Sequence, residues 1–403
     1  MRFFTTNPSD KRTRKSSWLI LVIFLLGAIS ANAQAQRPWW HSLEQGKLSF
    51  RSMDYGNALL SFEDARRQRR AMFERMEQDF INVLSIIEVR RIGDSLDLVE
   101  RYIYERRHTA AAAALEELYY RVPKASLGNS AASALEAFGK LKDYPEAEYW
   151  IGETFRVEGE LALALSQYRK AYAQREFLEN SGFDTDLQYK IAAILKTRQE
   201  YNEMEKILLS VIADSDTLWT NAAQAELASA AQRQTGNIPY VKAEASFASQ
   251  AMTSTLENEG INRFLTLYRY DNNLVLEAHR LLGYYYAVSG RPSAQQHLMF
   301  AFLIQNSTII SELIRRQYDY TFTSLAALAD DINRIPILSS YAQETEYFKT
   351  AYYLAASLYR NGKSGSARDI WTFLAAQSGA GEWQGRALAQ VRNPRLDPIV
   401  EMP

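Results

Sequence analysis

Apolar residues recur along this chain every three or four positions, which is the spacing of one face of an α-helix. Alanine-rich stretches such as 110–118 and 222–231 show this spacing, whereas the strict alternation of apolar and polar residues typical of strands is nearly absent. Five prolines stand between such stretches, where proline can begin or end a helix: Pro123, Pro145, Pro239, Pro292 and Pro336. The pattern predicts an all-α protein of about 17 to 20 helices, each about 10–16 residues long.

Residues 150–171 predict a pair of helices joined by a turn at Gly159. Small residues at Gly152 and Ala164 would let the two helices approach closely, and aromatic rings would fill the space beside them. The positions that define the pair are a large, a small and an aromatic residue on the first helix, then alanine, tyrosine and alanine on the second: Trp150, Gly152, Phe155, Ala164, Tyr168 and Ala171.

Five further segments repeat this arrangement: 46–65, 98–123, 191–208, 282–301 and 354–371. Together with 150–171 they resemble the tetratricopeptide repeat (TPR), a 34-residue helix–turn–helix unit. The resemblance implies a TPR-like α-solenoid built from helical hairpins. The matching positions are not 34 residues apart, so we expect divergent hairpins or inserted helices between them.

The segments suggest an order of parts along the chain. We expect an N-terminal TPR-like array over 36–270 and a C-terminal array over 271–393, with 394–403 as a flexible tail that contains three prolines.

Residues 57–92 contain no helix-breaking residue and predict one long helix within the first array. Its apolar positions are spaced by three and four, close to a heptad seam, and Arg66 and Arg69 occupy that seam. The seam would pack on the next hairpin of the same chain or on a second copy in a homodimer. We favour packing within the chain.

Residues 1–35 have the three parts of a secretory signal peptide. Five basic residues precede an uncharged stretch over 18–30, and small-x-small sequences follow at 31–33 and 33–35. A 13-residue helix spans about 20 Å, short of the ~30 Å hydrocarbon core of a bilayer. The sequence predicts export to the periplasm or cell envelope, with cleavage favoured over retention as an N-terminal membrane anchor.

Charge and composition exclude or disfavour several folds, partners and kinds of site. The 403 residues include 46 basic and 47 acidic side chains, and without 1–35 the net charge is about −5, which disfavours nucleic acid as a partner. Gly (18) and Pro (10) are too few for the many turns of an all-β fold. The absence of cysteine excludes disulfides, thiolate metal sites and a lipidated N-terminal Cys.

No motif for catalysis or cofactor binding stands out in the sequence. There is no GxSxG, GxxxxGK[ST], GxGxxG or HExxH. His279 and His297 fall on the two helices of one expected hairpin, but two histidines without a carboxylate partner are a weak metal site. We expect no enzyme, no cofactor and no metal.

The resemblance implies a concave wall made by first-helix residues that the hairpin does not need for its own packing. Tyrosine and arginine supply large contact areas with polar ends, so such a wall would suit a peptide or protein segment. Ten residues fall at these positions: Tyr149, Glu153, Arg156, Tyr189, Lys196, Arg280, Tyr284, Tyr352, Tyr359 and Arg360.

The sequence therefore predicts an exported scaffold that binds an unknown protein or peptide in its groove. One alternative is a small-molecule binding or transport-accessory protein, which a closed, mostly apolar cavity would favour. A second alternative is an envelope-assembly factor. The membrane would be involved only through an uncleaved N-terminal segment.

Overall fold

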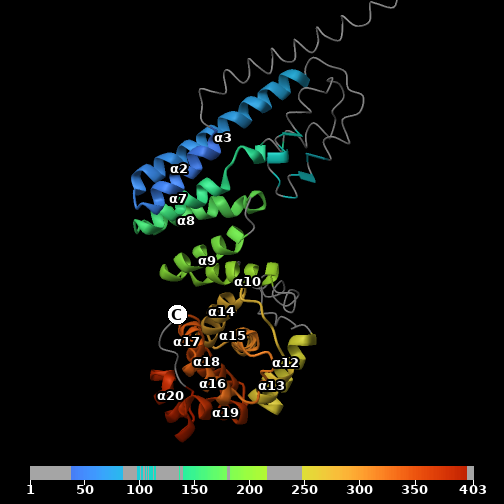
Figure 1. Cartoon of the computed structure of the whole chain (residues 1–403), viewed down its shortest axis with the longest axis vertical. Helices are drawn as coiled ribbons and strands as arrows, with labels where there is room; N and C mark the ends of the chain where they lie inside the picture. The colour runs from blue at the N-terminus through green and yellow to red at the C-terminus, as the bar shows by residue number, and fades with distance from the viewer. Residues whose placement is uncertain are drawn as a thin grey trace, which may run out of the picture. The chain divides into compact units, whose positions relative to one another are not determined.

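The computed structural model describes residues 38–84, 141–178, 182–215 and 247–396, with isolated positions between 98 and 140. Every regular element in these residues is a helix, so the predicted all-α class is confirmed (Figure 1). Ten helices form five hairpins: α2 (Trp39–Arg51) with α3 (Tyr55–Leu84), α7 (Pro145–Val157) with α8 (Leu161–Ala173), α9 (Gly182–Thr197) with α10 (Tyr201–Ser215), α14 (Leu276–Val288) with α15 (Ala294–Arg316), and α18 (Tyr347–Arg360) with α19 (Ser364–Ala375).

Seven further helices join or cover these hairpins in the described part of the chain. They are η1 (Arg175–Phe177), α12 (Phe247–Glu259), α13 (Ile261–Leu267), α16 (Leu325–Arg334), α17 (Pro336–Glu344), η2 (Ser378–Ala380) and α20 (Glu382–Arg392). Their presence between hairpins explains why the repeat positions in the sequence are not evenly spaced.

The chain divides into two compact units, and the division falls between Leu187 and Gln188, inside α9. We expected a boundary near residue 270 instead. Helix α10 packs on α14, so residues on both sides of 270 share one core within unit 2.

The close approach of paired helices that Gly152 and Ala164 predict is present in the structure. A Cβ atom placed on Gly152 would lie 2.6 Å from the Tyr168 ring and 3.4 Å from the Ala164 carbonyl oxygen. The same relation recurs in α14–α15, where a Cβ on Gly283 would lie 2.6 Å from Leu298. The two 2.6 Å distances are below normal van der Waals contact, so only glycine fits at these positions without displacing the facing side chain.

The five hairpins also share one turn geometry. Each contains a residue with positive φ two positions after the last residue of the first helix, and the next amide donates to the carbonyl five residues earlier at 2.8–2.9 Å. This is the Schellman arrangement that ends helices. Glycine fills the position in three turns, as at Gly159 (φ 85°), but Met53 (φ 62°) and Gln199 (φ 60°) fill it in α2–α3 and α9–α10.

Helix α3 confirms the predicted long helix as far as Leu84, and the rest of 57–92 lies outside the described residues. Phe62, Arg69 and Phe73 of its seam are buried, and α3 packs on α2 and α7. The Arg69 guanidinium donates to the Leu141 carbonyl at 3.0 Å and lies 4.5 Å from the centre of the Tyr144 ring. The described seam is therefore used within the chain, as we favoured. A homodimer through 57–92 stays a prediction.

Some expectations fall largely outside the described residues: the signal peptide over 1–35, the repeat over 98–123 and the end of the tail over 397–403. Within the described residues, α15 is the one helix long and apolar enough to cross a bilayer. However, 78% of its apolar stretch is buried inside the unit, which is usual for a central core helix. It is weak evidence for a membrane span.

Candidate functional site

In unit 1 the structure buries two of the three residues expected to line a groove. Tyr149 is 5% exposed, stacks on Phe183 with ring centres 4.7 Å apart, and donates a hydrogen bond to Asp186. Burial is the main cause of the raised pKa of the Tyr149 hydroxyl, and the bond to Asp186 adds to it. The first turn of α9 thus covers this part of α7, and the expectation that Tyr149 lines an open groove was wrong.

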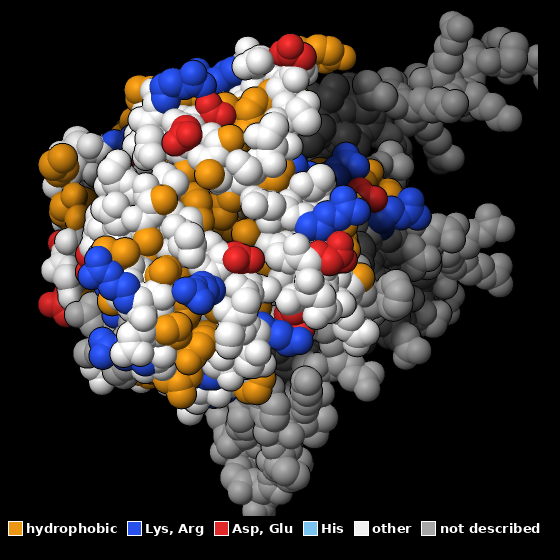
Figure 2. All heavy atoms as spheres, turned by 90° about the horizontal axis from the view of Figure 1, so that it is seen from below, with side chains coloured by type: hydrophobic (Ala, Val, Ile, Leu, Met, Phe, Trp, Pro, Cys, Tyr) orange, Lys and Arg blue, Asp and Glu red, His pale blue; other side chains and the backbone are white. Residues whose placement is uncertain are grey.

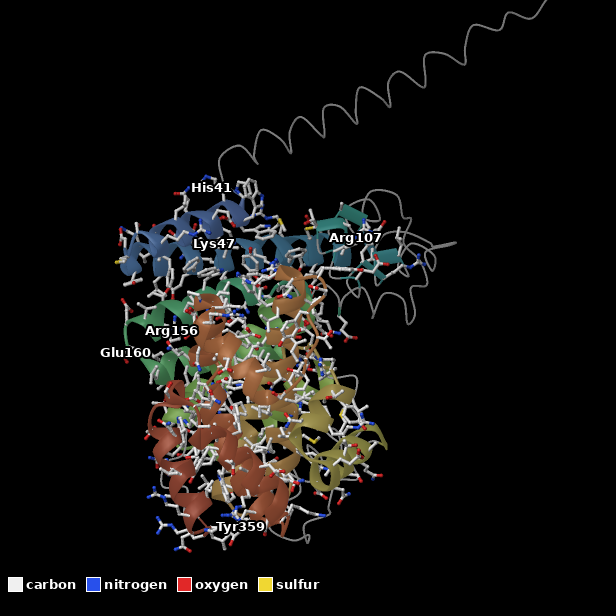
Figure 3. The ribbon with its side chains drawn as sticks, turned by 60° about the horizontal axis from the view of Figure 1, so that its bottom comes forward. His41, Lys47, Arg107, Arg156, Glu160 and Tyr359 are labelled. Carbon is white, nitrogen blue, oxygen red and sulfur yellow. The ribbon has the colours of Figure 1, made fainter. Side chains whose placement is uncertain are left out.

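Glu153 and Arg156 make polar contacts within the α7–α8 hairpin. Glu153 is 6% exposed; it accepts a hydrogen bond from the Tyr168 hydroxyl and pairs with Arg156 at 2.9 Å. Glu153 is therefore committed to its own hairpin and does not line a groove either. Figure 3 shows Arg156 with Glu160 at the outer end of this hairpin, and Arg156 remains exposed.

Two tyrosines of unit 2 are also core residues and not groove residues. Tyr284 is 1% exposed and shares a 3.0 Å hydrogen bond with Thr350 of α18. Tyr352 is fully buried, with the Trp383 ring of α20 at 5.4 Å between ring centres. The expectation of exposure failed at both positions because α18 and α20 each cover the outer face of the preceding first helix.

Tyr359 and Arg360, at the end of α18, contact other segments of unit 2. Tyr359, labelled in Figure 3, is half-buried. It packs against Trp371 with ring centres 5.6 Å apart and donates to the Pro394 carbonyl at 3.3 Å. Arg360 donates to the Ala287 carbonyl at 2.7 Å. That carbonyl lies in the last turn of α14, where a cation is favourable. Both contacts have a structural role.

The remaining expected residues do come together, on the first helices of three hairpins of unit 2. Lys196 of α9, Glu277 and Arg280 of α14, Glu346 at the start of α18 and Lys349 in its first turn form what we call the charged cluster. Arg280 is the centre: its side chain is 10% exposed and pairs with both Glu277 and Glu346. The two glutamates are 41% and 37% exposed, so the cluster reaches the surface through its acidic members.

Burial and charge act in opposite directions on two of the cluster's three cations, Arg280 and Lys196. Burial disfavours the charged form of Arg280, but Glu277, Tyr284 and Glu346 outweigh this and raise the pKa of Arg280. Lys196 is half-buried, and burial lowers its pKa despite the attraction of Glu277 and Glu346. Lys196 is therefore a partly desolvated ammonium held close to the surface, without a salt bridge to it in the described residues.

The Tyr189 hydroxyl and the backbone conformation of Glu346 also help to position the site. The Tyr189 hydroxyl of α9 donates to the Leu274 carbonyl and accepts from the Ala278 amide at 3.3 Å, which holds α9 against the start of α14. Glu346 adopts φ 51°, a left-handed conformation that costs a residue with a side chain about 1–2 kcal/mol. In this conformation its carboxylate pairs with both Arg280 and Lys349.

Sequence reasoning missed three members of the charged cluster. Glu277 stands three residues before Arg280, so helical spacing alone could have paired them. Lys349 stands three residues after Glu346, so the same spacing could have paired these two. Nothing local signals that Glu346 also pairs with Arg280, which lies 66 residues earlier in the chain.

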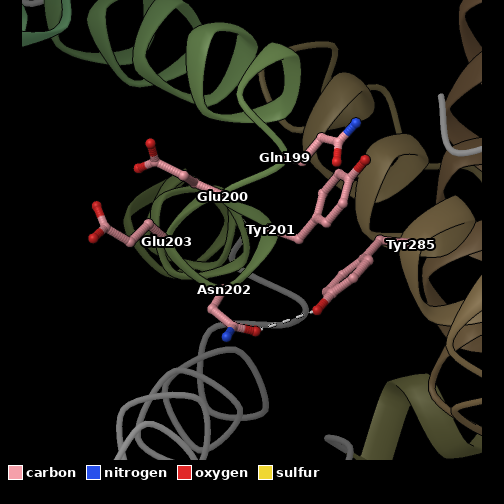
Figure 4. Close-up of a pocket in the computed structure, with 6 residues that line it drawn as sticks. All are labelled: Gln199, Glu200, Tyr201, Asn202, Glu203 and Tyr285. Atoms are coloured by element: carbon pink, nitrogen blue, oxygen red, sulfur yellow. Dashed lines mark hydrogen bonds between the residues drawn. The ribbon is translucent and has the colours of Figure 1, made fainter. Parts of the chain in front are cut away.

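An open pocket of about 360 Å³ adjoins the start of α10. Figure 4 shows Tyr201 and Tyr285 side by side, and their rings stack with centres 5.7 Å apart at an interplanar angle of 24°. Glu200 and Glu203 point away from this ring pair, on the other side of α10 (Figure 4). The pocket is a surface hollow with polar and aromatic walls.

The histidines form a core contact. His279 and His297 are fully buried, and their Nδ1 atoms share a 3.0 Å hydrogen bond, while the Phe300 ring stacks on His279. In the described part of the chain no three or more histidine, aspartate or glutamate side chains gather as a possible metal site. The arrangement packs α14 against α15.

The comparisons with known proteins give relatives without an assigned activity. No family model matches the chain. An uncharacterized protein of Treponema pallidum (strain Nichols) is 26% identical over 350 residues, which cover 86% of this chain and 88% of that protein. An uncharacterized protein of Borreliella burgdorferi (strain ATCC 35210 / DSM 4680 / CIP 102532 / B31) is 21% identical over 227 residues, covering 54% of this chain and 66% of that protein. Similarity to the first extends over most of both chains.

Proposed function

We propose that this protein is an exported, TPR-like scaffold that binds a peptide or protein segment in the cell envelope, and that the charged cluster of unit 2 is its main docking surface. The observation that carries the proposal is the convergence of α9, α14 and α18 on that cluster. Each of these first helices contributes charge to one surface, although they are far apart in the sequence. A surface assembled from several hairpins is how helical repeat proteins hold extended partners.

The chemistry of the cluster supports a polar partner. Two partly exposed carboxylates lie beside a half-buried ammonium. A partner with complementary charges would gain direct ion pairs in a partly desolvated setting, where they are stronger than in water. An anionic group would contact Lys196 and a cationic group Glu277 or Glu346.

The recurring hairpin geometry supports the TPR-like part of the proposal. The glycine contacts of α7–α8 and α14–α15 and the shared turn are what a repeated helix–turn–helix unit requires. The open, polar pocket beside α10 fits a binding scaffold better than it fits a closed site for an apolar small molecule. Export rests on the residues of 1–35 alone.

The proposal is tested by cross-linking in cells of the source organism, followed by affinity purification and mass spectrometry. We expect one or more envelope proteins to be recovered with the wild-type chain and much less with Lys196→Glu, which reverses a charge in the cluster. The matched control is Lys170→Glu at an exposed position of α8, which should leave recovery unchanged.

Equal recovery with both variants would reject the charged cluster as the docking surface. Recovery of the chain from the cytoplasmic fraction with Met1 intact would reject export.

A further inference from the structure

A second pocket, of about 410 Å³, lies where α13, α16 and α19 of unit 2 meet. None of its residues belongs to the charged cluster, and nothing in the proposed function uses it. Six of its residues define its chemistry: Glu259, Ile261, Leu325, Asp369, Thr372 and Phe373.

The frame of this pocket is held in place by hydrogen bonds. The Asn262 side-chain oxygen accepts from the Leu325 amide at 2.8 Å, which joins α13 to the start of α16. The Ser324 hydroxyl caps α16 by accepting from the Ala327 amide at 3.2 Å. These groups are already bonded, so the pocket is preformed and a ligand would not have to order it.

The pocket combines an apolar base with an acidic rim. Ile261 and Leu325 are buried and Phe373 is half-buried. Glu259 and Asp369 are exposed, and one Asp369 carboxylate oxygen lies only 3.6 Å from the Cβ position of Gly260, directly beside Glu259. Both acidic residues line the pocket beside this apolar surface.

The acidic rim is poorly neutralised by the chain itself. Glu259 has a 3.5 Å contact with Arg263, and both side chains are more than half exposed, so this pair contributes little. No ion pair within the described part of the chain reaches Asp369. On the face of the molecule shown in Figure 2, basic, acidic and apolar side chains are intermixed.

We propose that this pocket receives a lysine or arginine side chain of a protein partner. The aliphatic stem of such a side chain would lie on Leu325 and Ile261, and its cationic head would meet Asp369 and Glu259. The Phe373 ring adds a surface that attracts a cation. Lysine and arginine are the residues that combine a long apolar stem with a charged head. The pocket would therefore give the scaffold a second contact point, selective for basic segments.

The experiment is methyl NMR of the full chain with isoleucine and leucine labelled, titrated with three capped amino acids. The probes are N-acetyl-arginine methylamide, the uncharged N-acetyl-norleucine methylamide and the acidic N-acetyl-glutamate methylamide. The arginine probe should shift the Leu325 and Ile261 methyl signals with a Kd in the millimolar range, as expected for so small a ligand. The other two probes should leave these signals unmoved.

Variants then separate the acidic rim from the apolar base. Asp369→Asn keeps the shape and removes one charge, so it should weaken the arginine probe by about threefold or more. Asp369→Lys should abolish binding. Asp330→Asn, an exposed aspartate of α16 outside the pocket, is the control and should leave the affinity unchanged.

Three results would overturn the proposal: equal shifts with norleucine and arginine, shifts with the glutamate probe, or no shift at the pocket with arginine. Equal loss in Asp369→Asn and Asp330→Asn would also overturn it, since the effect would then be one of overall charge. None of these outcomes bears on Lys196 and the charged cluster, so the two proposals fail separately.

Discussion

The hairpins α7–α8 and α14–α15 share an internal design but use their outer faces differently. In both, a glycine of the first helix meets a large side chain of the second, Tyr168 opposite Gly152 and Leu298 opposite Gly283. On the outer face of α7, Arg156 remains exposed and pairs within its own hairpin. On the outer face of α14, Arg280 is buried against the start of α18.

This difference shows that a repeat sequence specifies the contacts within a hairpin but not those between a hairpin and the next layer. Contacts within a hairpin join residues about 15 positions apart and recur wherever the motif recurs. Contacts between a hairpin and the next layer depend on which helix lies there. Positions at the same distance from the motif glycine can therefore be surface in one repeat and core in another, as Arg156 and Ala287 are. The following predictions are ordered from the largest expected effect to the smallest.

The largest effect should come from removing a buried tyrosine of the outer face of α14. Tyr284→Ala should cost about 3–5 kcal/mol of unfolding free energy, the usual range for deleting a buried aromatic ring. Tyr318→Ala, at a tyrosine that is 96% exposed in the same unit, should change it by less than about 0.5 kcal/mol. Urea unfolding of each single variant measures the difference. Similar costs at the two sites would mean that α18 does not cover α14.

The shared internal packing can be broken in α7–α8 by a large residue at the helix crossing. Ala164 is fully buried against Gly152, so Ala164→Trp should cost about 1–3 kcal/mol or more through overpacking. Leu163, its neighbour on α8, is 47% exposed, so Leu163→Trp should be nearly neutral. Thermal unfolding by circular dichroism compares the two. An unchanged melting curve for Ala164→Trp would contradict the assignment of this hairpin.

Substitutions in the turns test whether the positive-φ residue costs a similar free energy in both units. Met53→Gly and Gln199→Gly should each stabilise the protein by about 0.5 kcal/mol, because glycine tolerates positive φ and loses only part of that gain to chain entropy. Gly290→Ala, at the same position of α14–α15, should instead cost about 1 kcal/mol. Chemical denaturation midpoints show whether each variant is more or less stable than the wild type. Destabilisation by both glycine variants would show that the left-handed turn is not the relevant state.

The smallest effect concerns the pH dependence of the charged cluster. Burial lowers the pKa of Lys196, so between that value and the ordinary lysine pKa of about 10.4 the unfolded chain binds more protons than the folded one. The contribution of Lys196 to stability should therefore rise with pH across this window. Lys196→Met loses that contribution, so its stability relative to the wild type should fall across the window, whereas Lys170→Met, at an exposed position of α8, should follow the wild type. Urea midpoints measured from neutral to alkaline pH check this. Identical curves for all three proteins would show that Lys196 is fully hydrated.

The sequence by itself determined the helices, the hairpins and the way each hairpin packs internally. Periodicity identified α7, α8, α14 and α15, and Gly152 and Ala164 predicted their own close contact, because these interactions join residues near one another in the chain. Even the extra-long α3 could be predicted from the lack of a helix breaker. The candidate residues Lys196 and Arg280 were found by the same reasoning from repeat positions.

Only the tertiary structure decided which of these outer-face residues reach solvent. Tyr284 is covered by Thr350 and its neighbours 66 residues later, and Tyr352 by Trp383 of α20. Glu346 pairs with Arg280 from a left-handed backbone conformation, which no local sequence pattern predicts. The physical reason is that the packing of one helical layer on the next depends on the fit of many side chains from distant segments, and a repeat motif specifies only the contacts inside its own hairpin.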